Sequence, residues 1–143
     1  MNTKFQKCLQ KGLIKPFSSG KILVKKELKN AKLDLSSAKK SFIEKNYKWA
    51  TIQLYYSMFH SARSLLYANN YREKSHACLI EAIRNFYTQK GEIGFWLIEA
   101  LQKARILREE ADYHGEFTRE QAQELLKNAR DFLSKAEDLL KKK

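Results

Sequence analysis

An arginine and a histidine near the end of one charged helical segment are the residues of this chain whose types could do chemistry. The stretch "LREEADYHGEF", residues 107–117, contains Arg108 and, six positions later, His114. A guanidinium can grip an anion through two parallel hydrogen bonds, and an imidazole can transfer a proton near neutral pH. The pair therefore has two interpretations: surface charges at a helix end, or two halves of an active site.

The register of Arg108 is unusual for a charged residue. It falls in line with an apolar stripe made of Leu97, Leu101, Ala104 and Ala111. A guanidinium in an inward-facing stripe needs partners, so Arg108 either reaches out to solvent, pairs with Asp112 one turn later, or belongs to a site. His114 lies about 120° around a regular helix from Arg108. The two side chains can meet only if the helix distorts before Gly115 or if a second copy of the chain contributes one of them.

The remaining histidines and cysteines give weaker signals. His60 lies beside an aromatic cluster and is interpreted as a core or boundary residue, whereas His76 stands in the first turn of a predicted helix, just after Lys74. A helix N-terminus disfavours a protonated imidazole, so His76 is predicted to be neutral. No pair of histidines or cysteines has the i, i+4 spacing of metal ligands on a helix, and we predict neither a metal site nor a cofactor.

The elements that must position these residues are predicted to be helices. The 143 residues are 43% hydrophobic but include only five glycines and one proline, which favours long helices over a loop-rich fold. Apolar residues recur at helical spacing in five segments, at about 21–44, 48–68, 75–89, 95–114 and from 118 onwards. The sequence predicts an all-α, up-and-down bundle of four to five helices over 18–143, preceded by an N-terminal extension at 1–17, with no strand.

The charge of the chain is basic and uneven. The formal net charge is +12, and residues 1–45 hold twelve lysines against three acidic residues, a net of +9. This balance raises the expectation of a polyanionic partner but equally fits a solvated surface. No apolar run reaches the ~20 residues of a membrane span. Two cysteines outside any CxxC pair predict a reduced, cytoplasmic protein.

Read together, the motifs resemble a known family. "YYSMFHSARSLLY" on the second helix, "YREKSH" before the third and "LREEADY" at the end of the fourth are similar to the HEPN domain family, in particular its prokaryotic stand-alone branch, over about residues 21–140. The resemblance implies a helical bundle that pairs as a homodimer. Many members are metal-independent ribonucleases with an Arg, four to six residues and a His at the cleft between protomers. Many also act as toxins beside a nucleotidyltransferase partner.

The resemblance assigns roles to the residues that match the motif. Arg108 would clamp the phosphate, His114 would be the acid/base and Asp112 would orient them, with Tyr113, Lys74 and His76 in support. RNA or a nucleotide would be the ligand, and the lysines of the first long helix could hold an RNA backbone.

Glu116 stands where the toxin versions carry a tyrosine, two residues after the His. Two other functions also stay open: a non-catalytic nucleotide- or partner-binding subunit of such a pair, and a plain helical interaction protein.

Overall fold

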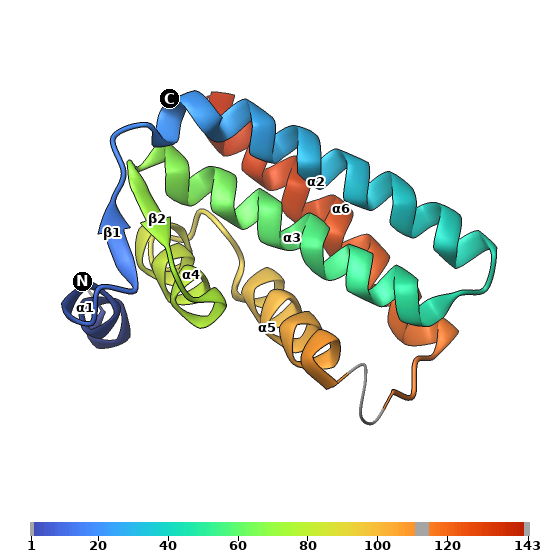
Figure 1. The fold of residues 1–143 in the computed structure, drawn as a ribbon. Coiled ribbons are helices and arrows are strands. Elements are labelled where there is room, and N and C mark those ends of the chain that lie inside the picture. Colours follow the sequence, from blue (N-terminus) through green and yellow to red (C-terminus); the bar gives the residue numbers. More distant parts are fainter. Residues whose placement is uncertain (1, 111–114, 142–143) are drawn as a thin grey trace.

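Helices form nearly all of the structure, a computed structural model that describes residues 2–110 and 115–141 (Figure 1). In chain order the elements are α1 (Thr3–Gln10), β1 (Ile14–Pro16), α2 (Gly20–Ile43), α3 (Tyr47–Ala68), β2 (Tyr71–Glu73), α4 (His76–Ile83), the π-helical turn η1 (Arg84–Thr88), α5 (Phe95–Glu110) and α6 (Arg119–Lys141). The predicted helical bundle is confirmed. Within the described residues, no helix is both long and apolar enough to cross a lipid bilayer.

Helix α3 is the centre of the bundle, as its sequence predicts. Its apolar residues spread around most of the helix, and α2, α5 and α6 all pack against it. Alanines with no exposed surface, such as Ala31 and Ala62, let the helices approach closely, and the Ser57 hydroxyl donates across the gap to the carbonyl oxygen of Ala31 at 2.8 Å. Figure 1 shows α2, α3 and α6 side by side along their lengths, with α4 and α5 beneath them.

Two helix starts follow the capping chemistry in the sequence. Ser75 precedes α4, and its side chain accepts a hydrogen bond from the backbone N–H of Cys78 at 3.3 Å. Thr118 precedes α6, and its hydroxyl accepts from the backbone N–H of Gln121 at 3.1 Å. Such caps satisfy donors that the first helical turn leaves unpaired. The cap at Ser75 fixes the position of His76 at the start of α4.

Residues 2–17 contribute several side chains to the bundle core. Phe5 is fully buried, and Ile14 is 1% exposed. Strand β1 pairs antiparallel with β2, with Lys15 opposite Arg72. The prediction of no strand is therefore wrong for this pair, because strands of three residues are too short to give a periodic signal.

The two cysteines are also joined, which contradicts the expectation of reduced thiols. Packing of α1 on α4 brings Cys8 and Cys78 to a Cα–Cα distance of 5.8 Å, and they form a disulfide. The two residues are 70 positions apart in the sequence, so no local motif indicated the pair.

Candidate functional site

One face of α3 gathers the polar and aromatic groups of the candidate site. Tyr55, Tyr56, Phe59, His60 and Arg63 follow one another at the helical spacings that place side chains on neighbouring positions of one face. Tyr55 and Phe59 are buried, and the other three are half-buried. Residues from α2, β2, α4 and α5 meet this face and divide it into two clusters, each built around an arginine.

The first cluster, called here the Arg108 cluster, consists of Arg108, Tyr55, Tyr56 and His76. Arg108 Nη1 donates a hydrogen bond to the Tyr56 hydroxyl at 3.2 Å. The guanidinium carbon lies 5.3 Å from the ring centre of Tyr55 and 5.6 Å from that of Tyr56, within the range of cation–π attraction. Arg108 Nε is buried and has no hydrogen-bond partner among the residues that the structure describes. No described carboxylate forms an ion pair with this cation.

His76 completes the Arg108 cluster from α4. Its Nδ1 lies 2.5 Å from the Tyr55 hydroxyl, and its ring lies 4.5 Å from the ring centre of Phe59. Burial lowers the pKa of His76, and the Arg108 cation lowers it further, so the imidazole is neutral near pH 7. The predicted neutrality of His76 is thus supported, although burial and Arg108 are the causes. Burial raises the pKa of Tyr55, which keeps this phenol protonated.

The second cluster, called here the Arg63 cluster, consists of Arg63, Glu27, Glu73 and His60. Arg63 Nη1 donates to Glu27 at 3.0 Å, and Arg63 Nη2 and Nε both donate to Glu73. The other oxygen of Glu27 lies 3.0 Å from His60 Nδ1. The guanidinium carbon of Arg63 also lies 4.3 Å from the ring centre of Phe59. This arginine therefore has two carboxylate partners, one of them bidentate.

The charges of the Arg63 cluster stabilise one another despite their burial. Burial raises the pKa of Glu27, but hydrogen bonds from His60 and Arg63 outweigh it, so the pKa lies below that of an ordinary glutamate. Burial lowers the pKa of Arg63, but Glu73 and Glu27 raise it more. All four groups are held in fixed positions, which is typical of a structural network.

The structure brings together some of the residues that the sequence indicated. Arg108 and His76 share one cluster, and Arg108 lies on the core side of α5, as its register predicts. Lys74 is exposed and belongs to the β1–β2 pair instead. Asp112, Tyr113 and His114 lie outside the described residues, so their predicted roles and the Arg108–His114 pair remain predictions.

Sequence reasoning missed the partners of Arg108 and the whole Arg63 cluster. The available signal was the run of polar and aromatic residues at Tyr55, Tyr56, His60 and Arg63 on a helix otherwise buried on most sides. A polar stripe on a central helix requires partners from its neighbours. The partners lie 10 to 52 residues away in sequence, so their identities could not be read from spacing.

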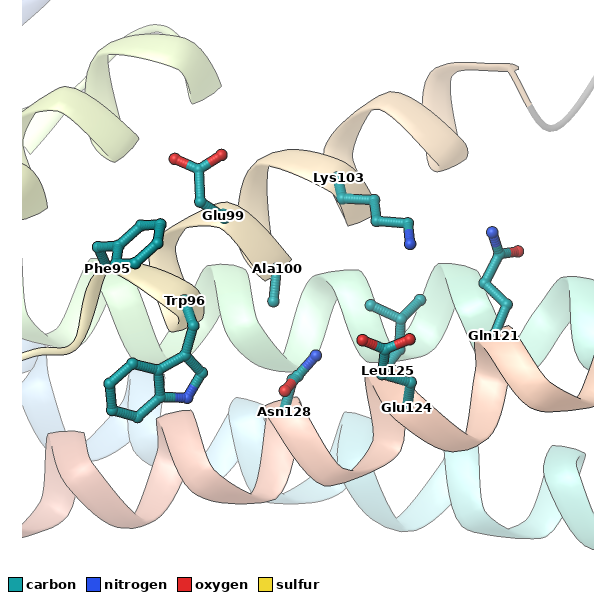
Figure 2. A pocket seen from close by; sticks show the side chains of 9 residues that line it. All are labelled: Phe95, Trp96, Glu99, Ala100, Lys103, Gln121, Glu124, Leu125 and Asn128. Carbon is teal, nitrogen blue, oxygen red and sulfur yellow. The ribbon is translucent and has the colours of Figure 1, made fainter.

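A surface pocket lies elsewhere, between α5 and α6. Figure 2 shows its lining side chains, with Phe95, Trp96 and Glu99 from the start of α5 and Gln121, Glu124 and Asn128 from α6. The pocket volume is about 330 Å³. It contains no residue of either arginine cluster. Among the described residues, no three His, Cys, Asp or Glu side chains are placed to hold a metal ion.

Comparisons with known proteins cover most of the chain. The family model of the HEPN domain matches residues 24–139, a range that contains both arginine clusters. A protein of Methanocaldococcus jannaschii named "Putative toxin MJ0605" is 33% identical over 112 residues, which are 78% of this chain and 84% of that protein. A second, named "Putative toxin MJ0142", is 26% identical over 119 residues, which are 82% of this chain and 81% of that protein.

Proposed function

This chain belongs to the HEPN domain family, and from that premise we propose that it is a toxin that cleaves RNA without a metal ion. The toxin assignment draws on the names of its two relatives from Methanocaldococcus jannaschii. The ribonuclease assignment draws on Arg108 and on its spacing to His114. An RNA substrate implies action in the cytoplasm.

The observation that carries the proposal is the state of Arg108. Its guanidinium is half-buried against two tyrosine rings, and within the described part of the chain its buried Nε has no partner and no carboxylate pairs with it. A cation held in this way keeps hydrogen-bond donors for an incoming anion. A phosphate offers the paired oxygens that a guanidinium grips best. The neutral His76 beside it adds no competing positive charge.

The proposed reaction uses His114 as the base. Its imidazole takes the proton of the ribose 2′-hydroxyl, the 2′ oxygen attacks the adjacent phosphorus, and the 5′ oxygen leaves with the proton that the imidazolium returns. The products are a 2′,3′-cyclic phosphate and a 5′-hydroxyl. Arg108 stabilises the negative charge that grows on the phosphate oxygens during attack. Asp112 orients the imidazole in this scheme, and Tyr113 lies beside it in the sequence.

The proposal includes a homodimer. Arg108 and His114 are separated by about 120° on a regular helix, so a second copy is the simplest way to complete the pair. Helix α5 carries Phe95 and Trp96, which are 68% and 60% exposed, and Ile106, which is 42% exposed. Exposed large apolar side chains on one helix support a protein partner there. A nucleotidyltransferase is the proposed regulatory partner of the dimer.

Cleavage of labelled single-stranded RNA in the presence of EDTA tests the proposal. The wild type should cut the RNA, whereas Arg108→Ala and His114→Ala should each lower the rate by at least a hundredfold with an unchanged circular dichroism spectrum. Arg105→Ala is the matched control, because Arg105 lies one turn earlier on α5 and pairs with Glu109. The proposed ribonuclease activity is contradicted if wild type leaves the RNA uncut, or if His114→Ala is as active as wild type.

A second candidate is a non-catalytic subunit that binds a nucleotide or a protein partner. The exposed Glu109, Glu110 and Glu116 flank the proposed His and would repel RNA, which favours this alternative. It predicts that wild type leaves RNA uncut. It also predicts that Arg108→Ala weakens nucleotide or partner binding while His114→Ala has little effect.

A further inference from the structure

The short β1–β2 sheet carries three cations on one face. Lys15 lies directly opposite Arg72 in the antiparallel register, and the backbone N–H of Lys74 donates to the carbonyl oxygen of Leu13 at 2.8 Å, which extends the pairing. Side chains two residues apart on a strand share a face, so Lys74 projects on the same side as Arg72 and diagonally from Lys15. All three are exposed. We call this surface the sheet cation face.

The sheet that presents these cations is fixed to the bundle. Its other face carries Ile14 and Glu73, which are buried, and Glu73 belongs to the Arg63 cluster. The Cys8–Cys78 disulfide joins α1 to α4 beside it. The three cations therefore project from an anchored backbone, and binding an anion would cost little ordering of the main chain.

The three cations have no described carboxylate to neutralise them. Lys74 lies so close to Lys15 that the neighbouring ammonium lowers the pKa of Lys74, with a smaller contribution from Arg72. Like charges on adjacent strands destabilise a sheet, and an anion between them removes the repulsion. The surrounding sequence adds to the field, because residues 2–17 contain four lysines and no acidic residue.

Aromatic rings adjoin the cations. The guanidinium carbon of Arg72 lies 5.5 Å from the ring centre of Phe17, and the Phe17 and Tyr67 ring centres are 5.2 Å apart. Both rings are partly exposed. Single-stranded nucleic acids bind to such a combination of cations for the backbone and aromatic rings for the bases.

A membrane surface fits this face less well than a nucleic acid. Interfacial membrane binding needs large apolar side chains beside the cations. The large hydrophobic side chains exposed in the described residues lie on α2, α3 and α5, and none of them lies on α1, β1 or β2.

We propose that the sheet cation face binds the phosphate backbone of single-stranded RNA. Lys15 lies before residue 24, where the family match begins, so the face includes a part of the chain outside the matched domain. Lys74 is two residues from His76 of the Arg108 cluster, and RNA on this face would continue toward that cluster. The inference goes beyond the proposed cleavage, since binding here requires no reaction.

Affinity for a fluorescein-labelled uridine 20-mer, measured by anisotropy between 50 and 200 mM salt, tests this surface. All proteins carry Arg108→Ala, so that the probe stays intact whether or not the wild type cleaves. The test variant is Lys15→Gln, Arg72→Gln and Lys74→Gln. The matched control removes the same charge from exposed positions of α6, with Lys127→Gln, Arg130→Gln and Lys135→Gln.

The test variant should bind at least tenfold more weakly. The slope of log affinity against log salt concentration should fall in magnitude by about 2, because each lost phosphate contact removes about 0.7. The control should bind within twofold of the parent with an unchanged slope. The exposed single variant Lys74→Gln should lower the slope by about 0.7 and serves if the triple variant is unstable. The proposal would be overturned if both triple variants lose RNA affinity equally, or if the test variant loses none. It is also overturned if the test variant binds RNA normally but loses binding to phosphatidylserine vesicles.

Discussion

Two arginines meet the same face of α3, and their surroundings differ in one respect. Each guanidinium lies over an aromatic ring, Arg63 over Phe59 and Arg108 over Tyr55. Arg63 is paired with two carboxylates, whereas the described hydrogen-bond partner of Arg108 is a single phenol, and its buried Nε has no partner among the described residues. The same face of α3 thus meets one arginine that two carboxylates neutralise and one arginine with no carboxylate partner among the described residues.

We expect this difference to separate a structural arginine from a functional one. Burying a cation costs free energy. Ion pairs offset this cost at Arg63, whereas no described ion pair offsets it at Arg108. A site that keeps such a cation is expected to use it, because substitution by an apolar side chain would otherwise stabilise the fold. Four comparisons of variants test whether the two arginines differ in this way.

The largest effect is expected from removing a carboxylate of the Arg63 cluster. Glu73→Ala should lower the free energy of unfolding by about 3–5 kcal/mol, because it leaves Arg63 short of its bidentate partner in a mostly buried position. Urea unfolding followed by circular dichroism measures this. Glu109→Ala removes the exposed partner of Arg105 and should cost no more than about 1 kcal/mol. Equal losses in the two variants would mean that the Arg63 cluster is not a buried network.

Acid should weaken the Arg63 cluster through Glu27. Its pKa in the folded protein lies below the ordinary value of 4.5, so its stabilising contribution is present above that pH. The contribution is lost as the pH falls toward the folded pKa, because the unfolded chain takes up the proton first. Between pH 5.5 and pH 3.5, wild type should lose more unfolding free energy than Glu27→Gln in urea titrations. Parallel losses would show that Glu27 carries no such linkage.

A smaller effect is expected at the hydrogen bond that holds Arg108. Tyr56→Phe removes the hydroxyl that accepts from Arg108 Nη1 and should cost about 1 kcal/mol of stability. Tyr71→Phe is the control, since its side chain is also half-buried and packs against Phe5 and Phe86. Thermal melts at one pH compare the two. A Tyr56→Phe variant as stable as the control would mean that solvent replaces this hydroxyl.

The smallest effect on stability is expected at Arg108 itself. Arg108→Met keeps the aliphatic stem of the side chain and should change the free energy of unfolding by less than about 1 kcal/mol, because no described ion pair is lost and the relieved desolvation of the cation offsets the lost hydrogen bond to Tyr56. Arg63→Met should cost several times more, since Glu27 and Glu73 then lose a shared partner. RNA cleavage should fail in Arg108→Met despite its intact fold. A large loss of stability there would assign Arg108 to the architecture.

The sequence predicted what local periodicity determines. Helix positions, the caps at Ser75 and Thr118, the central place of α3 and the inward register of Arg108 all follow from residues within a few turns. Tertiary pairs could not be predicted in this way. The Tyr55–His76 contact joins α3 to α4, and Arg63 reaches Glu27 across 36 positions of sequence.

The N-terminal segment shows the same limit. A break at Gly12 and a proline at position 16 indicated a separate extension, but Gly12 lies in the turn between α1 and β1, and Pro16 is the last residue of β1. Phe5 enters the core, and the three-residue strand β1 finds its partner more than fifty positions later. Proximity of this kind comes from packing, which spacing along the chain does not encode.

The Cys8–Cys78 bond makes the middle of the chain a covalent ring. The ring contains the whole of α2 and α3, and with them every member of the two arginine clusters except Arg108. After a single peptide-bond cleavage inside the ring, the disulfide would still join the two fragments covalently. The fragments would separate on a denaturing gel only after reduction. The bundle therefore tolerates a nick in its longest hairpin, between α2 and α3, without losing either half.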